Sequence, residues 1–209
     1  MNKVFIIGLP RTGTTSVCVA LLDQGLKVAH TAYTQQTFAL ADVLADTPCY
    51  CDYRQLDALF PDSKFIYLTR NLTSWVPSMQ MLLEKISKYL HPESHFNPII
   101  KRCFKQTFQL ETVSDPMSES HLSHCYELHQ KSILNYFSDR SDLLNLDVSQ
   151  ADGLSILLRF LGQDGKPDLG FPRVNTGRMI TAWHDIKHPN KISSSEHGPN
   201  RRKYFDFNQ

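Results

Sequence analysis

A glycine loop directly after a short apolar run constrains the fold more than any other feature of this sequence. Residues 4–7 are all apolar and show no period-2 alternation, which is typical of a strand buried on both faces of a parallel sheet. In residues 8–15 two glycines are separated by four residues and followed by a threonine. From Thr14 onward apolar residues recur at helical spacing until Gly25. Strand, glycine loop and helix in this order predict a loop that binds a phosphate group at a helix N-terminus.

The loop lacks the lysine that ATP- and GTP-hydrolysing loops place after the second glycine. Thr14 stands at that position, and Arg11 is the cation of the loop. No aspartate is clearly placed at a strand end to hold a magnesium ion. We therefore expect the loop to bind a phosphate that carries no metal-bridged γ-phosphoryl group.

The rest of the chain alternates strand-like and helix-like segments. Further strands are predicted at 27–30, 64–69 and 143–148, and helices at 34–46, 53–60, after Asn71 and at 153–161. Residues 92–140 read as helical throughout and interrupt this rhythm. The pattern predicts an α/β fold: a P-loop three-layer α/β/α architecture with a central parallel sheet and a helical insertion at about 78–140. The 209 residues fit a single domain.

Charge and composition exclude several classes of protein. The chain has 22 Lys and Arg against 21 Asp and Glu, which gives a net charge of +1. A net charge this small produces no electrostatic field strong enough to indicate binding to nucleic acid or to a membrane surface. No apolar run approaches the roughly 18 to 20 residues of a bilayer span, and the N-terminal run is too short for a secretory signal. We expect a cytoplasmic protein. The five scattered cysteines predict free thiols.

Two pairs of histidines have the spacing of helix-borne metal ligands. His91 and His95 are four residues apart, as are His184 and His188. Pro92 breaks the first pair, and no cysteine or glutamate completes either of them. We expect no metal site.

At the loop and at the end of strand 64–69 the sequence resembles the sulfotransferases that use 3′-phosphoadenosine 5′-phosphosulfate (PAPS). Their 5′-phosphosulfate loop reads roughly Pro-Lys/Arg-Ser/Thr-Gly-Thr-Thr. Their second signature is an arginine at a strand end with a serine eight residues later, as in Arg70 and Ser78. A third likeness, to bacterial-type members, is the Phe-Pro-x-x-Asn element at 171–175. The residues that match the loop are Pro10, Arg11, Thr12, Gly13, Thr14 and Thr15.

This resemblance implies an enzyme that transfers a sulfuryl group from PAPS to a hydroxyl acceptor, either a small molecule or a glycan. Arg11 would neutralise the bridging oxygen of the leaving phosphosulfate, while the loop amides and the helix N-terminus stabilise the sulfuryl group without a metal. Arg70 and Ser78 would bind the 3′-phosphate, because a guanidinium grips a phosphate through two parallel hydrogen bonds.

An acceptor hydroxyl must lose its proton during the attack, so a general base is expected nearby. In cytosolic family members the base is a histidine two residues before a proline. Asp46 occupies that place in Asp46-Thr47-Pro48, and a carboxylate base has precedent in the family. His30, at the end of predicted strand 27–30, is the rival, because the ordinary pKa of histidine suits a base.

Two other functions stay open at this point. A kinase or nucleotide hydrolase on the same type of loop is disfavoured by Thr14. A binding module that has lost its acceptor site would keep affinity for the nucleotide without turnover.

Two further regions carry predictions that depend on the fold. The aromatic residues of the helical block are expected either to line an acceptor pocket or to form core. The last stretch, about 187–209, is basic and is expected as a mobile tail or a closing loop, with Arg201, Arg202 and Lys203 as candidate contacts of the 3′-phosphate.

Overall fold

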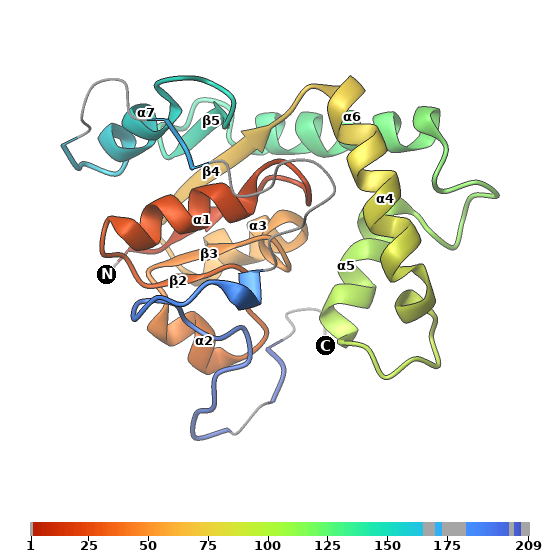
Figure 1. Ribbon diagram of the computed structural model, residues 1–209, viewed down its shortest axis with the longest axis horizontal. Helices are drawn as coiled ribbons and strands as arrows, with labels where there is room; N and C mark the ends of the chain where they lie inside the picture. Colours follow the sequence, from red (N-terminus) through yellow and green to blue (C-terminus); the bar gives the residue numbers. More distant parts are fainter. Residues whose placement is uncertain (1, 165–169, 173–182, 201–202, 206–209) are drawn as a thin grey trace.

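The computed structural model describes residues 2–164, 170–172, 183–200 and 203–205. Its centre is a parallel sheet of five strands in the order β2-β3-β1-β4-β5, as Figure 1 shows. This is the predicted α/β fold with a central parallel sheet. The strands are β1 (Val4–Ile6), β2 (Val28–Ala29), β3 (Val43–Ala45), β4 (Lys64–Thr69) and β5 (Leu143–Asp147).

Helices cover both faces of the sheet, because successive side chains of a strand point to opposite sides. One core cluster joins Ile6 and Ile66 to α1 (Thr14–Asp23) and α7 (Gly153–Phe160). On the other face Phe5 and Phe65 pack with α2 (Gln35–Leu40), α3 (Cys49–Leu59) and α6 (Glu119–Tyr136). The apolar runs in β1 and β4 therefore serve two cores at once.

A third core lies within the helices that connect β4 to β5. It forms between α4 (Leu72–Leu90), α5 (Pro98–Phe108) and α6, which stand together beside the sheet in Figure 1. Each helix begins at a residue whose side chain accepts a hydrogen bond from a backbone N–H of the first turn. The aromatic residues Phe104, Phe108 and Tyr126 are buried in this core. They do not line the main cavity, so they form no acceptor wall there.

The segment 34–46 is not the single helix that its apolar spacing predicts. Helix α2 ends at Leu40, Ala41 is extended, and Val43–Ala45 forms a fully buried strand between β1 and β2. The carboxylate of Asp42 holds the turn by accepting a hydrogen bond from the Lys27 N–H at 2.9 Å. A three-residue strand is too short to show a period of its own, so the neighbouring helical period masked it.

Part of the basic C-terminal stretch, which was expected as a mobile tail or a closing loop, lies against the sheet. Its described residues run along the free edge of β2: the Val28 N–H donates to the Asn190 carbonyl at 3.0 Å, and the Ile192 N–H donates to the Val28 carbonyl at 2.9 Å. Further along, the Tyr33 N–H donates to the Ser194 carbonyl. Arg201 and Arg202 lie outside the described residues, and Lys203 is exposed.

The cysteines differ in part from the prediction of five free thiols. Cys51 of α3 and Cys103 of α5 form a disulfide, with Cα atoms 5.9 Å apart, whereas Cys18, Cys49 and Cys125 are free and buried. The two helices pack together, and this contact across 52 residues of sequence is not visible in the spacing of the cysteines.

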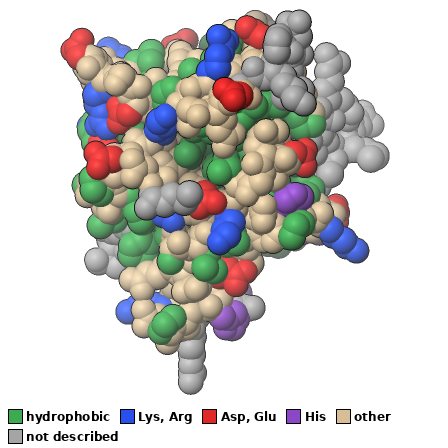
Figure 2. All heavy atoms as spheres, turned by 90° about the vertical axis from the view of Figure 1, so that its left-hand side faces the viewer, with side chains coloured by type: hydrophobic (Ala, Val, Ile, Leu, Met, Phe, Trp, Pro, Cys, Tyr) green, Lys and Arg blue, Asp and Glu red, His purple; other side chains and the backbone are tan. Residues whose placement is uncertain are grey.

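The surface agrees with the near-zero net charge. Figure 2 shows acidic and basic side chains interspersed over one face of the molecule. Among the described residues, no helix combines the length and apolar character needed to cross a bilayer.

Candidate active site

The phosphate loop joins β1 to α1 in a tightly packed turn. A Cβ atom on Gly8 would lie 2.6 Å from the Leu68 Cβ, and one on Gly13 would lie 2.6 Å from a methyl group of Val148. Gly13 also has a φ of +103°, a left-handed conformation that favours glycine. The loop therefore needs glycine at both positions. Because α1 starts at Thr14, the amides of its first turn have no carbonyl partner within the helix.

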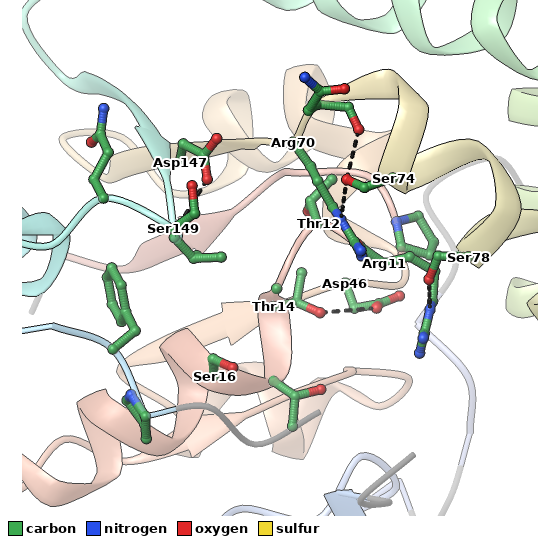
Figure 3. A pocket seen from close by; sticks show the side chains of 18 of the residues that line it. Arg11, Thr12, Thr14, Ser16, Asp46, Arg70, Ser74, Ser78, Asp147 and Ser149 are labelled. Carbon is green, nitrogen blue, oxygen red and sulfur yellow. Dashed lines mark hydrogen bonds between the residues drawn. The ribbon is translucent and has the colours of Figure 1, made fainter. Parts of the chain in front are cut away.

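The loop forms the floor of a cavity of about 970 Å³ at the carboxyl ends of the strands. Parallel α/β sheets bind their ligands at this edge. Figure 3 shows Ser78 beside Arg11, Ser74 beside Arg70, and Asp46 beside Thr14 around this cavity. All residues predicted to bind the donor line this cavity, namely Pro10, Arg11, Thr12, Gly13, Thr14, Thr15, Arg70 and Ser78. Both candidate bases, Asp46 and His30, line it as well.

One side of the cavity, here called the arginine wall, consists of Arg11, Arg70, Ser74 and Ser78. The Arg11 Nε donates to the Ser78 Oγ at 2.8 Å, so the loop cation is tied to the helix that follows β4. Arg70 donates from Nη1 to the Arg11 carbonyl at 2.8 Å and from Nε to the Ser74 Oγ at 3.1 Å. Two guanidinium groups thus share one network with two hydroxyl groups.

Burial and charge both act on Arg11. Its pKa is lowered, first by burial and then by the neighbouring charge of Arg70, while Asp46 works in the opposite direction. Two guanidinium groups held this close, with the single carboxylate of Asp46 acting on Arg11, form a site suited to an anionic ligand.

Two residues outside the motifs hold the arginine wall in place. The Tyr126 hydroxyl accepts from the Arg70 N–H at 2.9 Å and donates to the Arg70 carbonyl at 3.0 Å. The Trp75 Nε1 donates to the Pro10 carbonyl at 2.9 Å. Trp75 and Tyr126 belong to helices α4 and α6, so the helical block fixes both the loop and the end of β4. The sequence carries no signal for these long-range contacts.

A second part of the cavity lining, here called the histidine wall, consists of His30, Asp46 and Trp183. Asp46 follows β3 in a left-handed conformation with a φ of 50°. Its Oδ1 accepts from the Thr47 N–H at 2.8 Å and from the Thr47 hydroxyl at 3.1 Å. Its Oδ2 accepts from the Thr14 hydroxyl at 3.4 Å. The backbone and Thr47 therefore fix one oxygen, and the other faces the phosphate loop.

His30 lies at the end of β2 and reaches the same threonines. Its Nε2 is 3.2 Å from the Thr14 Oγ1 and 3.0 Å from the Thr15 Oγ1. Burial lowers the pKa of His30 below its ordinary value, and Asp46 opposes this effect. The imidazole is therefore mainly neutral at pH 7. The two candidate bases, predicted as alternatives, meet at one hydroxyl group of the phosphate loop.

The histidine pairs that have metal-ligand spacing make other contacts. The His184 Nε2 lies 2.9 Å from the Asp185 Oδ1, and the His188 Nδ1 accepts from the Asn190 N–H at 3.1 Å. In the part of the chain that the structure describes, Cys51, Asp52 and Cys103 are the one group close enough to share a metal ion. These cysteines are joined as a disulfide, and Asp52 forms a two-pronged ion pair with Arg102. The expectation that no metal is bound stays a prediction.

The cavity also includes residues that the motifs do not reveal. The last residue of β5, Asp147, and Ser149 of the following turn line it, and the Ser149 N–H donates to the Asp147 Oδ1 at 2.8 Å. Phe171 and Pro172 of the predicted Phe-Pro-x-x-Asn element line it as well, whereas residues 173–175 lie outside the described residues. Because parallel sheets bind ligands at the carboxyl ends of their strands, the place of Asp147 near the end of a predicted strand could have marked it as a site residue.

Comparisons with known proteins agree with this architecture. A family model for the sulfotransferase domain matches residues 31–180. Ava biosynthesis cluster protein M from Aspergillus versicolor is 31% identical over a 111-residue alignment that covers 39% of this chain and 43% of that protein. The chain thus spans less than half the length of this curated relative. The crystal structure of a sulfotransferase from Alicyclobacillus acidocaldarius superimposes with a TM-score of 0.50 at 13% identity, over 85% of this chain and 87% of that one, and so shares the fold.

Proposed function

Because the chain belongs to the sulfotransferase family, we propose that it transfers a sulfuryl group from PAPS to a hydroxyl acceptor, in line and without a metal. The observation that carries this proposal is the arginine wall, in which Arg11, Arg70 and Ser78 meet above the phosphate loop. The family model matches only from residue 31 onward, so the phosphate loop at residues 8–15 supports the proposal independently of that match.

The donor has two anionic groups, and the cavity offers two places for them. The 5′-phosphosulfate fits the loop from Pro10 to Thr15, where the first-turn amides of α1 and the guanidinium of Arg11 supply hydrogen bonds and positive charge. The 3′-phosphate fits Arg70 with the hydroxyl groups of Ser74 and Ser78. Phe171 offers an aromatic face for the adenine ring.

The proposed transfer needs no metal because of the charge on the transferred group. A sulfuryl group in transfer carries less negative charge than a phosphoryl group, so one arginine and a helix N-terminus can stabilise it. Thr14 also takes the place of the lysine that a β,γ-phosphate pair requires. Arg11 would stabilise the negative charge on the bridging oxygen as its bond to sulfur breaks.

The proton of the acceptor hydroxyl needs a base as the new sulfur–oxygen bond forms. We assign this role to the Oδ2 of Asp46, because its Oδ1 is already occupied by the two Thr47 donors. His30 is the alternative base, since its imidazole is neutral at pH 7 and lines the same cavity. The products are the sulfated acceptor and adenosine 3′,5′-bisphosphate.

The acceptor is proposed to be a small molecule or a glycan that presents a hydroxyl group. Pro77, Met81 and Leu82 on α4 give the cavity an apolar strip beside Ser78. This strip favours an acceptor with an apolar body next to the reacting hydroxyl. The residues assigned to the donor come from the loop after β1, the end of β4, helix α4 and position 171, so we further propose that residues 1–209 act as one domain with a helical insertion.

Calorimetric titration with adenosine 3′,5′-bisphosphate tests the proposal, with adenosine 5′-monophosphate and magnesium ATP as controls at equal concentrations. We expect micromolar or tighter binding that requires the 3′-phosphate and is unaffected by magnesium. A preference for magnesium ATP would overturn the proposal in favour of a kinase or nucleotide hydrolase. Donor binding without turnover on a panel of phenols, alcohols and sugars would indicate a module that binds but does not catalyse.

A further inference from the structure

The C-terminal segment places one aromatic side chain in the cavity. Residues 190–194 follow the edge of β2 through backbone hydrogen bonds, and Val28 and Lys191 form a parallel bridge. The short helix η1 (Trp183–Asp185) lies just before this stretch, and Trp183 lines the cavity. Strand β2, which His30 directly follows, therefore also anchors the segment carrying Trp183.

Lys191 fixes the position of Trp183. Its ammonium group donates to three backbone carbonyls, those of Trp183 at 2.6 Å, His184 at 3.2 Å and Ile186 at 2.8 Å. These bonds use all three donors of the ammonium group. The same nitrogen lies 5.2 Å from the centre of the Trp183 ring. Burial lowers the pKa of Lys191, and the charge of Asp185 opposes this effect.

Trp183 in turn supports His30. The two rings are stacked, with centroids 5.4 Å apart and planes inclined by 29°. The Nε2 of His30 then meets the hydroxyl groups of Thr14 and Thr15. Lys191, Trp183, His30 and the two threonines thus form a continuous series of contacts, here called the support column, from the C-terminal segment to the phosphate loop.

We propose that Trp183 is a positioning residue of the donor site, which holds His30 against the phosphate-loop hydroxyl groups and is itself held by Lys191. This inference rests on the proposed function. The support column orders the side chains of Thr14 and Thr15 before the donor binds, so less conformational entropy is lost on binding. The charged and titratable groups that face His30 are Asp46 from the end of β3 and Lys191 from the C-terminal segment.

The first test is the affinity for adenosine 3′,5′-bisphosphate in four variants. We expect Trp183→Ala and Lys191→Met to weaken binding roughly three- to tenfold, the range associated with losing one aromatic contact. Trp183→Phe keeps a ring on His30 and should restore most of the affinity. His184→Ala is the matched control, because this neighbouring side chain is 81% exposed. Wild-type affinity in both Trp183→Ala and Lys191→Met would overturn the inference.

The second test needs no ligand. A protonated imidazole quenches the fluorescence of an indole stacked on it, so tryptophan emission should fall as His30 takes up a proton. Because burial lowers the pKa of His30, the midpoint should lie below about pH 6.5. His30→Gln and Trp183→Phe should abolish this transition, Lys191→Met should reduce its amplitude, and His184→Ala should keep it.

The two tests separate the inference from the proposed function. If the wild-type protein fails to bind adenosine 3′,5′-bisphosphate but shows the quenching transition, the support column stands and the donor assignment is wrong. If the wild-type protein binds the nucleotide but shows no transition that depends on His30, the support column is wrong. Thermal unfolding of each variant checks that the fold is intact.

Discussion

The two walls of the cavity are built in different ways. The arginine wall takes Arg11 from the loop after β1 and Arg70, Ser74 and Ser78 from the end of β4 and the first turns of α4. The histidine wall takes its three side chains from the ends of β2 and β3 and from the C-terminal segment. A wall formed from two compact motifs can be read from sequence spacing, whereas a wall assembled from three distant segments depends on the fold.

The difference extends to chemistry. The arginine wall carries fixed positive charge in a network of short hydrogen bonds, and so it suits binding and stabilising an anion. The histidine wall holds a carboxylate with one oxygen left for the loop and a neutral imidazole, and so it suits proton transfer. Substitutions in the two walls should therefore affect different kinetic parameters.

The largest effect is expected from the histidine wall. Asp46→Asn keeps the shape of the side chain and removes its basicity, and kcat should fall roughly 10²- to 10⁴-fold, the usual contribution of a general base. Affinity for adenosine 3′,5′-bisphosphate should change little. Steady-state kinetics with saturating donor gives kcat, and His30→Gln is measured alongside. An undiminished rate in Asp46→Asn would move the base to His30 or to water.

Arg11→Ala tests whether the arginine wall acts in the transition state as well as in binding. We expect kcat to fall by about 10²- to 10³-fold, as when one donor to a developing anion is lost. Thermal unfolding should change little, because Arg11 is only partly buried. Ser78→Ala separates the loss of the guanidinium from the loss of its hydrogen bond to α4. Equal kcat in Arg11→Ala and wild type would limit Arg11 to a structural role.

His129, a second histidine whose pKa is lowered, tests the pH dependence of folding stability separately from the chemistry of the histidine wall. His129 is half-buried and does not line the cavity, and the burial of its ring lowers its pKa to about 4, although its contact with the Tyr50 carbonyl opposes this. The unfolded chain binds this proton more readily, with a pKa near 6.5. The free energy of unfolding should therefore drop by about 3 kcal/mol as pH falls from 6.5 to 4.

Urea unfolding at several pH values measures this effect, and His129→Gln provides the comparison. The variant should lose most of the pH dependence between 6.5 and 4, while the fluorescence transition assigned to His30 remains. Equal pH dependence in the variant and the wild type would show that other groups govern acid unfolding.

Arg70→Ala should affect binding more than turnover. We expect affinity for adenosine 3′,5′-bisphosphate to fall by roughly 10- to 100-fold, the range for losing hydrogen bonds to a charged group. Affinity for adenosine 5′-monophosphate should fall much less, so the preference for the 3′-phosphate disappears. Arg70→Lys keeps the charge but not the planar fork and should lie between the two. Unchanged nucleotide affinity would show that the 3′-phosphate binds elsewhere.

The two walls also differ in how well their residues could be predicted from the sequence. Arg11 was predicted from the glycine loop, whereas Arg70 and Ser78 were assigned through the resemblance, because they match the family's arginine and serine eight residues apart. Strand β3 was mistaken for helix, since three buried residues next to α2 carry no period of their own. Asp46 was nevertheless placed at the site by resemblance, through its position before Pro48.

Other contacts had no signal in the sequence. The stacking of Trp183 on His30 and the disulfide between Cys51 and Cys103 join residues that are far apart in the chain. Spacing rules describe neighbours on one element, so they are silent on pairs that only the packing of β2, α3 and α5 brings together.

The smallest effect is expected from Thr47, which orients the base without contacting the loop. Thr47→Val preserves the branched shape and the backbone donor at 2.8 Å, but removes the hydroxyl that donates to the Asp46 Oδ1 at 3.1 Å. The carboxylate then has one fixed contact instead of two and can rotate away from the acceptor. We expect kcat to fall roughly twofold to tenfold, in line with the loss of one hydrogen bond. Nucleotide affinity should stay constant.

The matched variant Thr47→Ser restores the hydroxyl group and should recover the rate. Thr47 is 2% exposed, so thermal unfolding of both variants is needed to separate a packing defect from a loss of orientation. If Thr47→Val is as active as the wild type, the backbone N–H alone orients Asp46. If Thr47→Val and Thr47→Ser are equally slow, the effect comes from packing. A slow Thr47→Val with an active Thr47→Ser assigns the effect to the hydroxyl group, and adds to the histidine wall a residue to which the sequence assigned no role.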